Sequence, residues 1–373
     1  MTVKELAYST QQHLQASTGA NFKRAHIYEL LAASFGFNSY AALGADSVFA
    51  ERRSTNGHSS INEAVIRARC VALRYHPDVA KTTSLALSAF VVEQQIVVVR
   101  IADLVAELRD EGGELDDLDD IFDEDRLANS LDLSSSILLD GLEGAASKGN
   151  ASAHYALALI NAPDEADEGH EIGSEYWYAQ AQQGRSLSGV EKEWADAHAT
   201  RLATVAKYVH HLRSAARLGQ QNALLELANQ FDDPAFFEQV EPHVNSDPAL
   251  VAEIAERLGR KEDAKQWLTA AAESGDIEAM RQLIEDYDHD DLQRCWTWVY
   301  YAELVGADLT KDEHYAIHED VSEYDDDVGG TAFVAGRDGV KLDPLGMEHD
   351  ASARRAAQEF FKKSKSNGTG LAL

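Results

Sequence analysis

The 373-residue chain is acidic, with 33 lysines and arginines against 64 aspartates and glutamates and a formal net charge of −31. Such a charge repels nucleic-acid phosphates and anionic lipid headgroups, so it argues against binding to nucleic acids or membrane surfaces. It suits a basic protein partner, or it simply keeps the protein soluble. Two cysteines, Cys70 and Cys295, are too few for a disulfide framework or a cysteine-rich zinc site.

Composition also favours helices. The chain has six prolines and 45% hydrophobic residues, so it can bury a core and has few helix breakers. The N-terminal sequence MTVKELAYSTQQHL has no apolar core of signal-peptide length. The best candidate for a membrane span, residues 88–105, is interrupted by Glu93, Gln94, Gln95 and Arg100. We therefore expect an all-α cytoplasmic protein without a membrane segment.

Residues 1–109 are predicted to form an N-terminal helical module. Residues 3–18 have helical spacing, and residues 22–46 predict a helix, a turn at Gly36 and a short second helix. A long helix is expected from Ser84 to Leu108. The short helices resemble a helix-turn-helix module, but NSYAALGAD lacks the basic side chains of a DNA-reading helix. Capping of a helical array is the preferred role.

The stretch VALRYHPDVAK contains a tripeptide, His76-Pro77-Asp78, that follows a predicted helix. It resembles the end of the basic helix and the His-Pro-Asp loop of J-domains, which stimulate the ATPase of Hsp70-type chaperones. The segment after it is apolar and β-branched, unlike the charged helix of that family. A Pro-Asp pair after a helix is also an ordinary helix stop signal, so both interpretations stay open.

Residues 110–136 are predicted to form an acidic linker or an amphipathic helix. Ten of the sixteen residues from 110 to 125 are acidic, yet apolar residues recur among them at three- and four-residue spacing. This stripe either packs on the protein's own helices or binds a partner. The candidate partner-binding residues are Leu115, Leu118, Asp119, Asp120 and Phe122, with Trp194 in addition.

Residues 137–309 contain an internal repeat. The pattern A-A-x-x-G-x-x-x-A-x-x-x-L occurs three times, and two weaker copies complete a series of glycines spaced by 35, 35, 56 and 31 residues. The interval of 56 suggests an extra helix within residues 232–252. Four copies place a ring eight residues before the glycine, at Tyr176, His211, Trp267 and Trp298. The predicted packing residues are Gly149, Gly184, Gly219, Trp267, Gly275, Trp298 and Gly306.

The copy DAKQWLTAAAESGDIEAM resembles the Sel-one-like repeat family, relatives of tetratricopeptide repeats. The resemblance covers residues 138–308. It implies an α-solenoid of antiparallel helix hairpins with a concave binding surface, in a protein that acts as an adaptor or scaffold without catalysis of its own. The second glycine that is usual in the family's helix-to-helix loop is missing from most copies.

Residues 310–373 are predicted to form a C-terminal cap and tail. Turn signals favour a small β-hairpin about Asp338 and Gly339, and a helix is expected from Ala351 to Lys363. His314 and His318 would lie one turn apart on a helix, a spacing that can bind zinc. A solvated helix is the preferred interpretation, and we expect no bound metal or cofactor.

The predicted function is a non-catalytic scaffold or adaptor, of bacterial type, that binds another protein on its solenoid surface. Phosphate-binding loops, H-E-x-x-H and G-x-S-x-G are all missing from the sequence, so an enzyme is not expected. One alternative is an immunity or antitoxin-like inhibitor of a basic effector protein. Another is a chaperone-linked regulator that acts through His76, Pro77 and Asp78.

Overall fold

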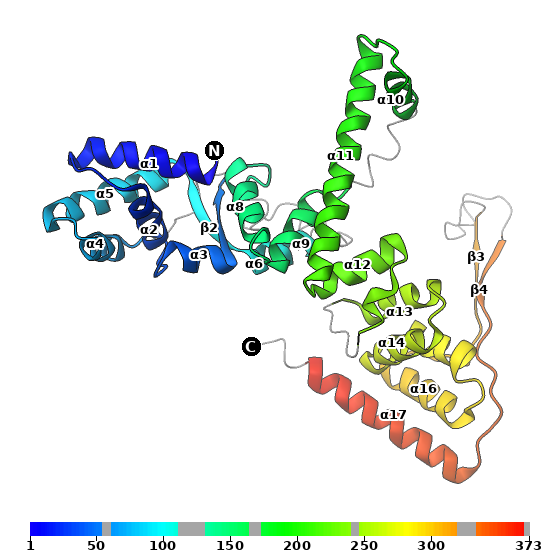
Figure 1. The fold of residues 1–373 in the computed structure, drawn as a ribbon. Helices are drawn as coiled ribbons and strands as arrows, with labels where there is room; N and C mark the ends of the chain where they lie inside the picture. The colour runs from blue at the N-terminus through cyan, green and yellow to red at the C-terminus, as the bar shows by residue number, and fades with distance from the viewer. Residues whose placement is uncertain (54–60, 111–130, 164–172, 240–245, 319–332, 369–373) are drawn as a thin grey trace. The chain divides into compact units, whose positions relative to one another are not determined.

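The chain is mostly helical, and its described strands form two small antiparallel sheets of two strands each (Figure 1). It divides into two compact units, Met1–Leu227 and Ala228–Leu373. The boundary falls inside α12 (Gln221–Phe231) and within residues 137–309, the stretch predicted to carry the repeats. The computed structural model describes residues 1–53, 61–110, 131–163, 173–239, 246–318 and 333–368.

The predicted helices at the N-terminus are confirmed. They are α1 (Val3–Thr18), α2 (Arg24–Ser34) and α3 (Tyr40–Asp46). Thr2 begins α1 with a capping box, because its hydroxyl accepts the Glu5 N–H at 3.3 Å while the Glu5 carboxylate accepts the Thr2 N–H at 2.8 Å. Gly36, with φ +85°, makes the expected turn between α2 and α3.

The long helix predicted from Ser84 to Leu108 is wrong, because a strand interrupts it. Its β-branched sequence IVVV pairs antiparallel with β1 (Ser47–Glu51), and Val98 lies opposite Phe49. Gln95, with φ +55°, turns the chain out of the preceding helix. The observed order is α5 (Pro77–Glu93), β2 (Ile96–Arg100) and α6 (Ile101–Asp110).

The tripeptide His76-Pro77-Asp78 lies between two helices that pack on each other, α4 (Glu63–Ala72) and α5. His76 is the N-cap residue of α5, and its Nδ1 accepts the Asp78 N–H at 3.4 Å. Pro77 occupies the first turn, where its missing N–H costs no hydrogen bond. The preceding helix ends at Ala72, as the helix-stop interpretation expects, and the Pro-Asp pair begins the next helix.

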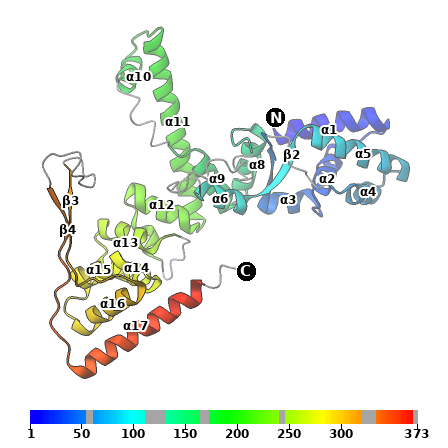
Figure 2. The same cartoon turned by 180° about the vertical axis from the view of Figure 1, so that it is seen from behind.

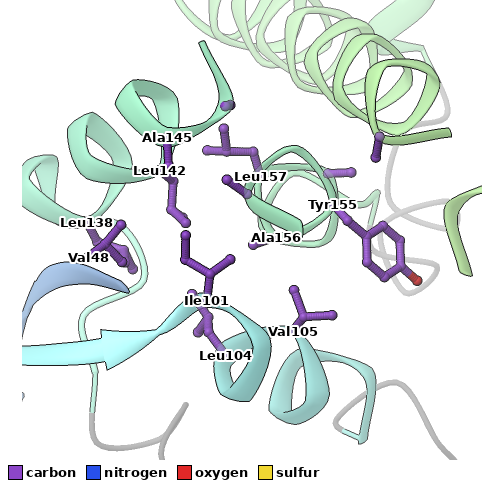
Figure 3. Close-up of a cluster of buried hydrophobic side chains, with 14 of the residues drawn as sticks. Val48, Ile101, Leu104, Val105, Leu138, Leu142, Ala145, Tyr155, Ala156 and Leu157 are labelled. Carbon is purple, nitrogen blue, oxygen red and sulfur yellow. The ribbon is translucent and has the colours of Figure 1, made fainter. Parts of the chain in front are cut away.

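One of the two cores in the first unit is built from both strands of the first sheet and several helices. Side chains of β1, α6, α8 (Ser136–Ala146) and α9 (Ala151–Ile160) converge in Figure 3. Ile101, Leu142 and Leu157 are all buried there. Three more helices follow, and the second and third of them also contribute buried side chains to this core. The remaining helices around this point are α10 (Ser174–Gln182), α11 (Val190–Arg217) and α12 (Gln221–Phe231).

The second unit is a run of short helices closed by a long one. The extra helix predicted within residues 232–252 overlaps η3 and the start of α13, and the predicted helix at 351–363 is confirmed as part of α17. α17 packs along α16 (Figure 2). In chain order they are η3 (Pro234–Phe236), α13 (Pro248–Arg257), α14 (Lys261–Ser274), α15 (Ile277–Gln282), the π-helix η4 (Leu283–Tyr287), α16 (Leu292–Val305) and α17 (Met347–Gly368).

The repeated glycines share one local structure. Gly149, Gly184, Gly219, Gly275 and Gly306 all have positive φ and follow a helix. After each, the next residue donates its N–H to the carbonyl four residues before the glycine, as Asp276 does to Ala271 at 3.2 Å. Asp276 also caps the following helix. Ala145, Ala215, Ala271 and Ala302 accept these bonds and are buried, which explains the A-A-x-x-G pattern.

The C-terminal hairpin exists, but its predicted turn and pairing are wrong. β3 (Glu313–Ile317) pairs antiparallel with β4 (Phe333–Arg337), so β4 pairs with residues that precede it and not across a turn at Asp338 and Gly339. The stretch around His314 and His318 is therefore a strand end and not a helix. His314 Nε2 lies 3.0 Å from an Asp338 carboxylate oxygen, which fixes the ring on the hairpin.

Candidate functional site

The candidate site is a helical arm in the first unit, formed by α10 and residues 190–206 of α11. The two helices pack on each other. Ser174, Ala195 and His198 are the buried residues of this arm, whereas the C-terminal half of α11 buries larger side chains such as Tyr208 and Leu212. The arm therefore extends beyond the core that anchors it (Figure 1).

Apolar side chains form a stripe along the arm. Val190, Trp194 and Leu202 are 55%, 47% and 43% exposed, and with His198 they recur at every fourth residue of α11. This spacing places them on one face of the helix. Tyr176 on α10 is also 55% exposed. Clustered exposed apolar residues, with tryptophan and tyrosine among them, are typical of protein-binding surfaces.

Aromatic contacts hold the two helices of the arm together. The Tyr178 and His198 rings lie 5.0 Å apart, and the Arg185 guanidinium lies 5.0 Å from the centroid of the Trp177 ring. A β-carbon added to Gly173 would come within 3.9 Å of the Trp194 ring, so that ring covers the start of α10. Contacts of this kind stabilise the pair of helices, and they bury His198 while Val190, Trp194 and Leu202 stay partly exposed.

Two ion pairs on the arm are exposed to solvent, and each joins a basic and an acidic side chain. Lys192 Nζ lies 2.8 Å from an Asp196 carboxylate oxygen, and Arg185 lies 3.8 Å from Glu191. Exposed pairs of this kind contribute little to stability. The arm therefore carries charges of both signs. The chain as a whole has a net charge of −31, so its electrostatic field attracts cations.

A second cluster lies where α11 packs on α9. His154 Nδ1 and His211 Nδ1 are 3.0 Å apart, with the His210 ring 5.1 Å from that of His211. Burial, aided by the neighbouring charges of His154, His210 and Lys207, lowers the pKa of His211 to about 4. Burial and the nearby His210 charge also lower the pKa of His154. The pair therefore holds its contact in the neutral form.

The predicted partner-binding residues divide into two groups. Trp194 lies on the exposed stripe of the arm. Leu115, Leu118, Asp119, Asp120 and Phe122 lie outside the described residues. Sequence reasoning missed Tyr176 as a surface residue, because the repeat pattern assigned it to packing. It also missed Val190 and Leu202, although their spacing of four and eight residues from Trp194 was a usable signal.

The sequence also singled out the tripeptide His76-Pro77-Asp78 and the possible metal ligands His314 and His318. Within the described ranges, histidine, cysteine and acidic side chains form no group of three that could hold a metal ion. The His76 side chain is 71% exposed beside Asp78. None of the helices in the described part of the chain has the length and apolarity that crossing a bilayer requires.

Comparisons with models of protein families, with curated proteins and with solved structures found no match for this chain.

Proposed function

We propose that this chain is a non-catalytic cytoplasmic scaffold, built from Sel-one-like helix hairpins, that binds a partner protein through the arm of α10 and α11. The exposed stripe of Val190, Trp194 and Leu202 is the observation that supports the proposal. Burying a tryptophan and two aliphatic side chains against a partner would gain several kcal/mol, at about 25 cal/mol per Å² of apolar area. Such residues dominate the binding energy of interfaces.

The proposed partner is a basic protein. The chain's net charge of −31 would speed encounter with a positively charged surface and would repel an acidic one. The acid Glu193 at the start of α11 is exposed beside Trp194, and it would meet basic residues at the rim of the interface. Binding should therefore weaken as salt is raised, because exposed charges are screened over about 10 Å at 0.1 M salt.

The test is affinity purification of the tagged full chain from its native cell, followed by mass spectrometry. We expect basic proteins that bind the wild type to be lost with the double variant Trp194→Ser and Leu202→Ser. The matched control is Val92→Ser, which removes an apolar side chain that is 58% exposed on α5. Equal recovery with the arm variant, or recovery of nothing by a folded wild type, would contradict the proposal.

A further inference from the structure

A pocket in the first unit has features of a small-molecule site. It has a volume of about 330 Å³ and lies among the start of α1, the helices α2, α3 and α8, and β1. Small-molecule sites in proteins fall in the range of about 300–1,000 Å³. We call it the glycine pocket, because Gly44 on α3 and Gly141 and Gly144 on α8 line it.

These glycines are unusual in their position. Gly141 lies in the middle of α8, and Gly44 and Gly144 lie inside α3 and α8 two residues before the last residue of each; all three line this pocket. Glycine inside a helix costs stability relative to alanine. Three such residues from two helices at one pocket therefore require a reason.

Packing within the chain explains one of the three. A β-carbon on Gly141 would lie 3.2 Å from Cβ of Val48, so this glycine lets α8 approach β1. A β-carbon on Gly144 would meet nothing within 4 Å, and one on Gly44 would meet Lys148 Nζ alone, at 3.8 Å. Gly44 and Gly144 thus keep open a space that the described protein atoms do not fill.

The pocket is lined by two tyrosine rings and by buried apolar side chains. The Tyr28 and Tyr40 rings lie 4.8 Å apart at an angle of 37°. Burial, with smaller effects of Tyr28 and Asp140, raises the pKa of the Tyr40 phenol, which keeps its proton as a hydrogen-bond donor. Leu43 and Phe49 are buried beneath them. A flat, apolar group fits such a surface.

Two ammonium groups give the pocket a positive rim. Lys4 and Lys148 are exposed, and in the described part of the chain neither has an ion pair. Asp140 is the acidic residue of the lining, and its Oδ2 accepts the Val3 N–H at 3.1 Å. The lining thus has two positive charges against one negative, in a chain of net charge −31. Lysines left unpaired in so acidic a protein are suited to an anion.

We propose that the glycine pocket binds a small ligand with a planar apolar body and an anionic group, either a carboxylate or a phosphate. The planar body lies against Tyr28 and Tyr40 over the space left by Gly44 and Gly144, and the anion binds Lys4 and Lys148. This site is separate from the arm and does not depend on it.

The test is titration of the full chain with benzoate, phenyl phosphate, neutral benzamide and cationic benzylamine, followed by ligand-observed NMR. We expect benzoate or phenyl phosphate to bind at least about tenfold more tightly than benzamide or benzylamine, since a charge-assisted hydrogen bond contributes about that factor. The tighter of the two anions identifies the preferred group. Failure of both to bind at millimolar concentration would overturn the proposal.

Variants separate the pocket from adventitious binding. Lys148→Met should weaken binding of the anionic probe about tenfold without changing the melting temperature. Gly144→Ala should raise the melting temperature and weaken binding, and Gly144→Leu should abolish binding. The matched control is Glu143→Leu, at an exposed position of the same helix. A melting temperature lowered by Gly144→Ala, or binding that survives Gly144→Leu, would refute the assignment.

Discussion

The ends of α10 and α16 have the same local structure but opposite surroundings. Gly184 and Gly306 have φ of +88° and +106°, and each is followed by a residue that donates to the carbonyl four positions before the glycine. Eight residues before them, Tyr176 is 55% exposed and Trp298 is 1% exposed. The helix end at Gly184 therefore belongs to an exposed arm, and the helix end at Gly306 belongs to a core.

The difference arises from the neighbouring elements. Trp298 stacks on Phe360 of α17, with ring centroids 5.2 Å apart and an interplanar angle of 7°, and its Nε1 donates to Asp288 at 3.0 Å. α10 packs on α11, and Gln180 stands where the other four copies have a buried alanine. The glycine ends the helix in both places, but other elements decide whether its aromatic residue is buried.

The largest predicted effect concerns these two aromatic residues. Trp298→Ala should lower the free energy of unfolding by about 3–5 kcal/mol, because it leaves a cavity and removes a partner of Asp288. Tyr176→Ala should change it by less than about 0.5 kcal/mol. Denaturant unfolding of both variants, followed by circular dichroism, would measure this. Similar losses in the two would show that the arm is as tightly packed as the core.

Two aspartates make a second comparison. Asp288, whose side chain is 1% exposed, lies 2.7 Å from Lys265 Nζ and 2.8 Å from Arg294 Nε. Asp288→Asn should cost about 3 kcal/mol, because it leaves two positive charges without their partner. Asp196 has an equally short pair with Lys192, at 2.8 Å, but its side chain is 64% exposed. Asp196→Asn should leave the unfolding midpoint unchanged, and a large shift there would refute burial as the deciding factor.

The glycines that end helices, Gly184 and Gly275, should respond alike to substitution by alanine despite their different surroundings. Gly275→Ala and Gly184→Ala each force a β-carbon into a left-handed conformation, at a cost of about 1–2 kcal/mol. Denaturant unfolding would measure the first, and hydrogen exchange of the α10 amides would measure the second. As a control, Ala179→Gly in the middle of α10 should cost less, about 1 kcal/mol. If Gly184→Ala leaves the protection of the α10 amides intact, the two glycines do not play the same role at their helix ends.

Helix ends were the most predictable part of the fold. Glycine, alanine and capping residues act through bonds to the next few residues, so the ends at Gly149 and Gly275 could be located from the sequence. The strand β2 could not, because its run of valines also fits a buried helix until its partner β1 is known. The hairpin of β3 and β4 was mispredicted for the same reason, since pairing joins residues distant in the chain.

The sites were less predictable than the helices. Trp194 was named from the sequence, but its exposure depends on how little of α10 and α11 is covered. The glycine pocket gave no local signal, because Gly44 and Gly144 lie 100 residues apart and meet through the packing of α3 and α8. The spacing of residues in the sequence shows which residues share a face of one helix, but it does not show which helix faces pack against each other.

The smallest predicted effect is the pH dependence of stability that His211 causes in the packed half of α11. His211, held neutral beside His154, has a pKa of about 4, below the ordinary value of 6.5. As pH falls from 6.5 toward 4, the unfolded chain takes up a proton that the folded chain refuses, so stability present at neutral pH is lost. Solvent screens the partly exposed ring, so we expect a loss of about 1 kcal/mol between pH 7 and pH 5. His211→Asn should reduce this loss, whereas His76→Asn, at an exposed helix start, should leave it unchanged. The measurement is denaturant unfolding at both pH values, and an equal loss in wild type and His211→Asn would show that the pair does not govern it.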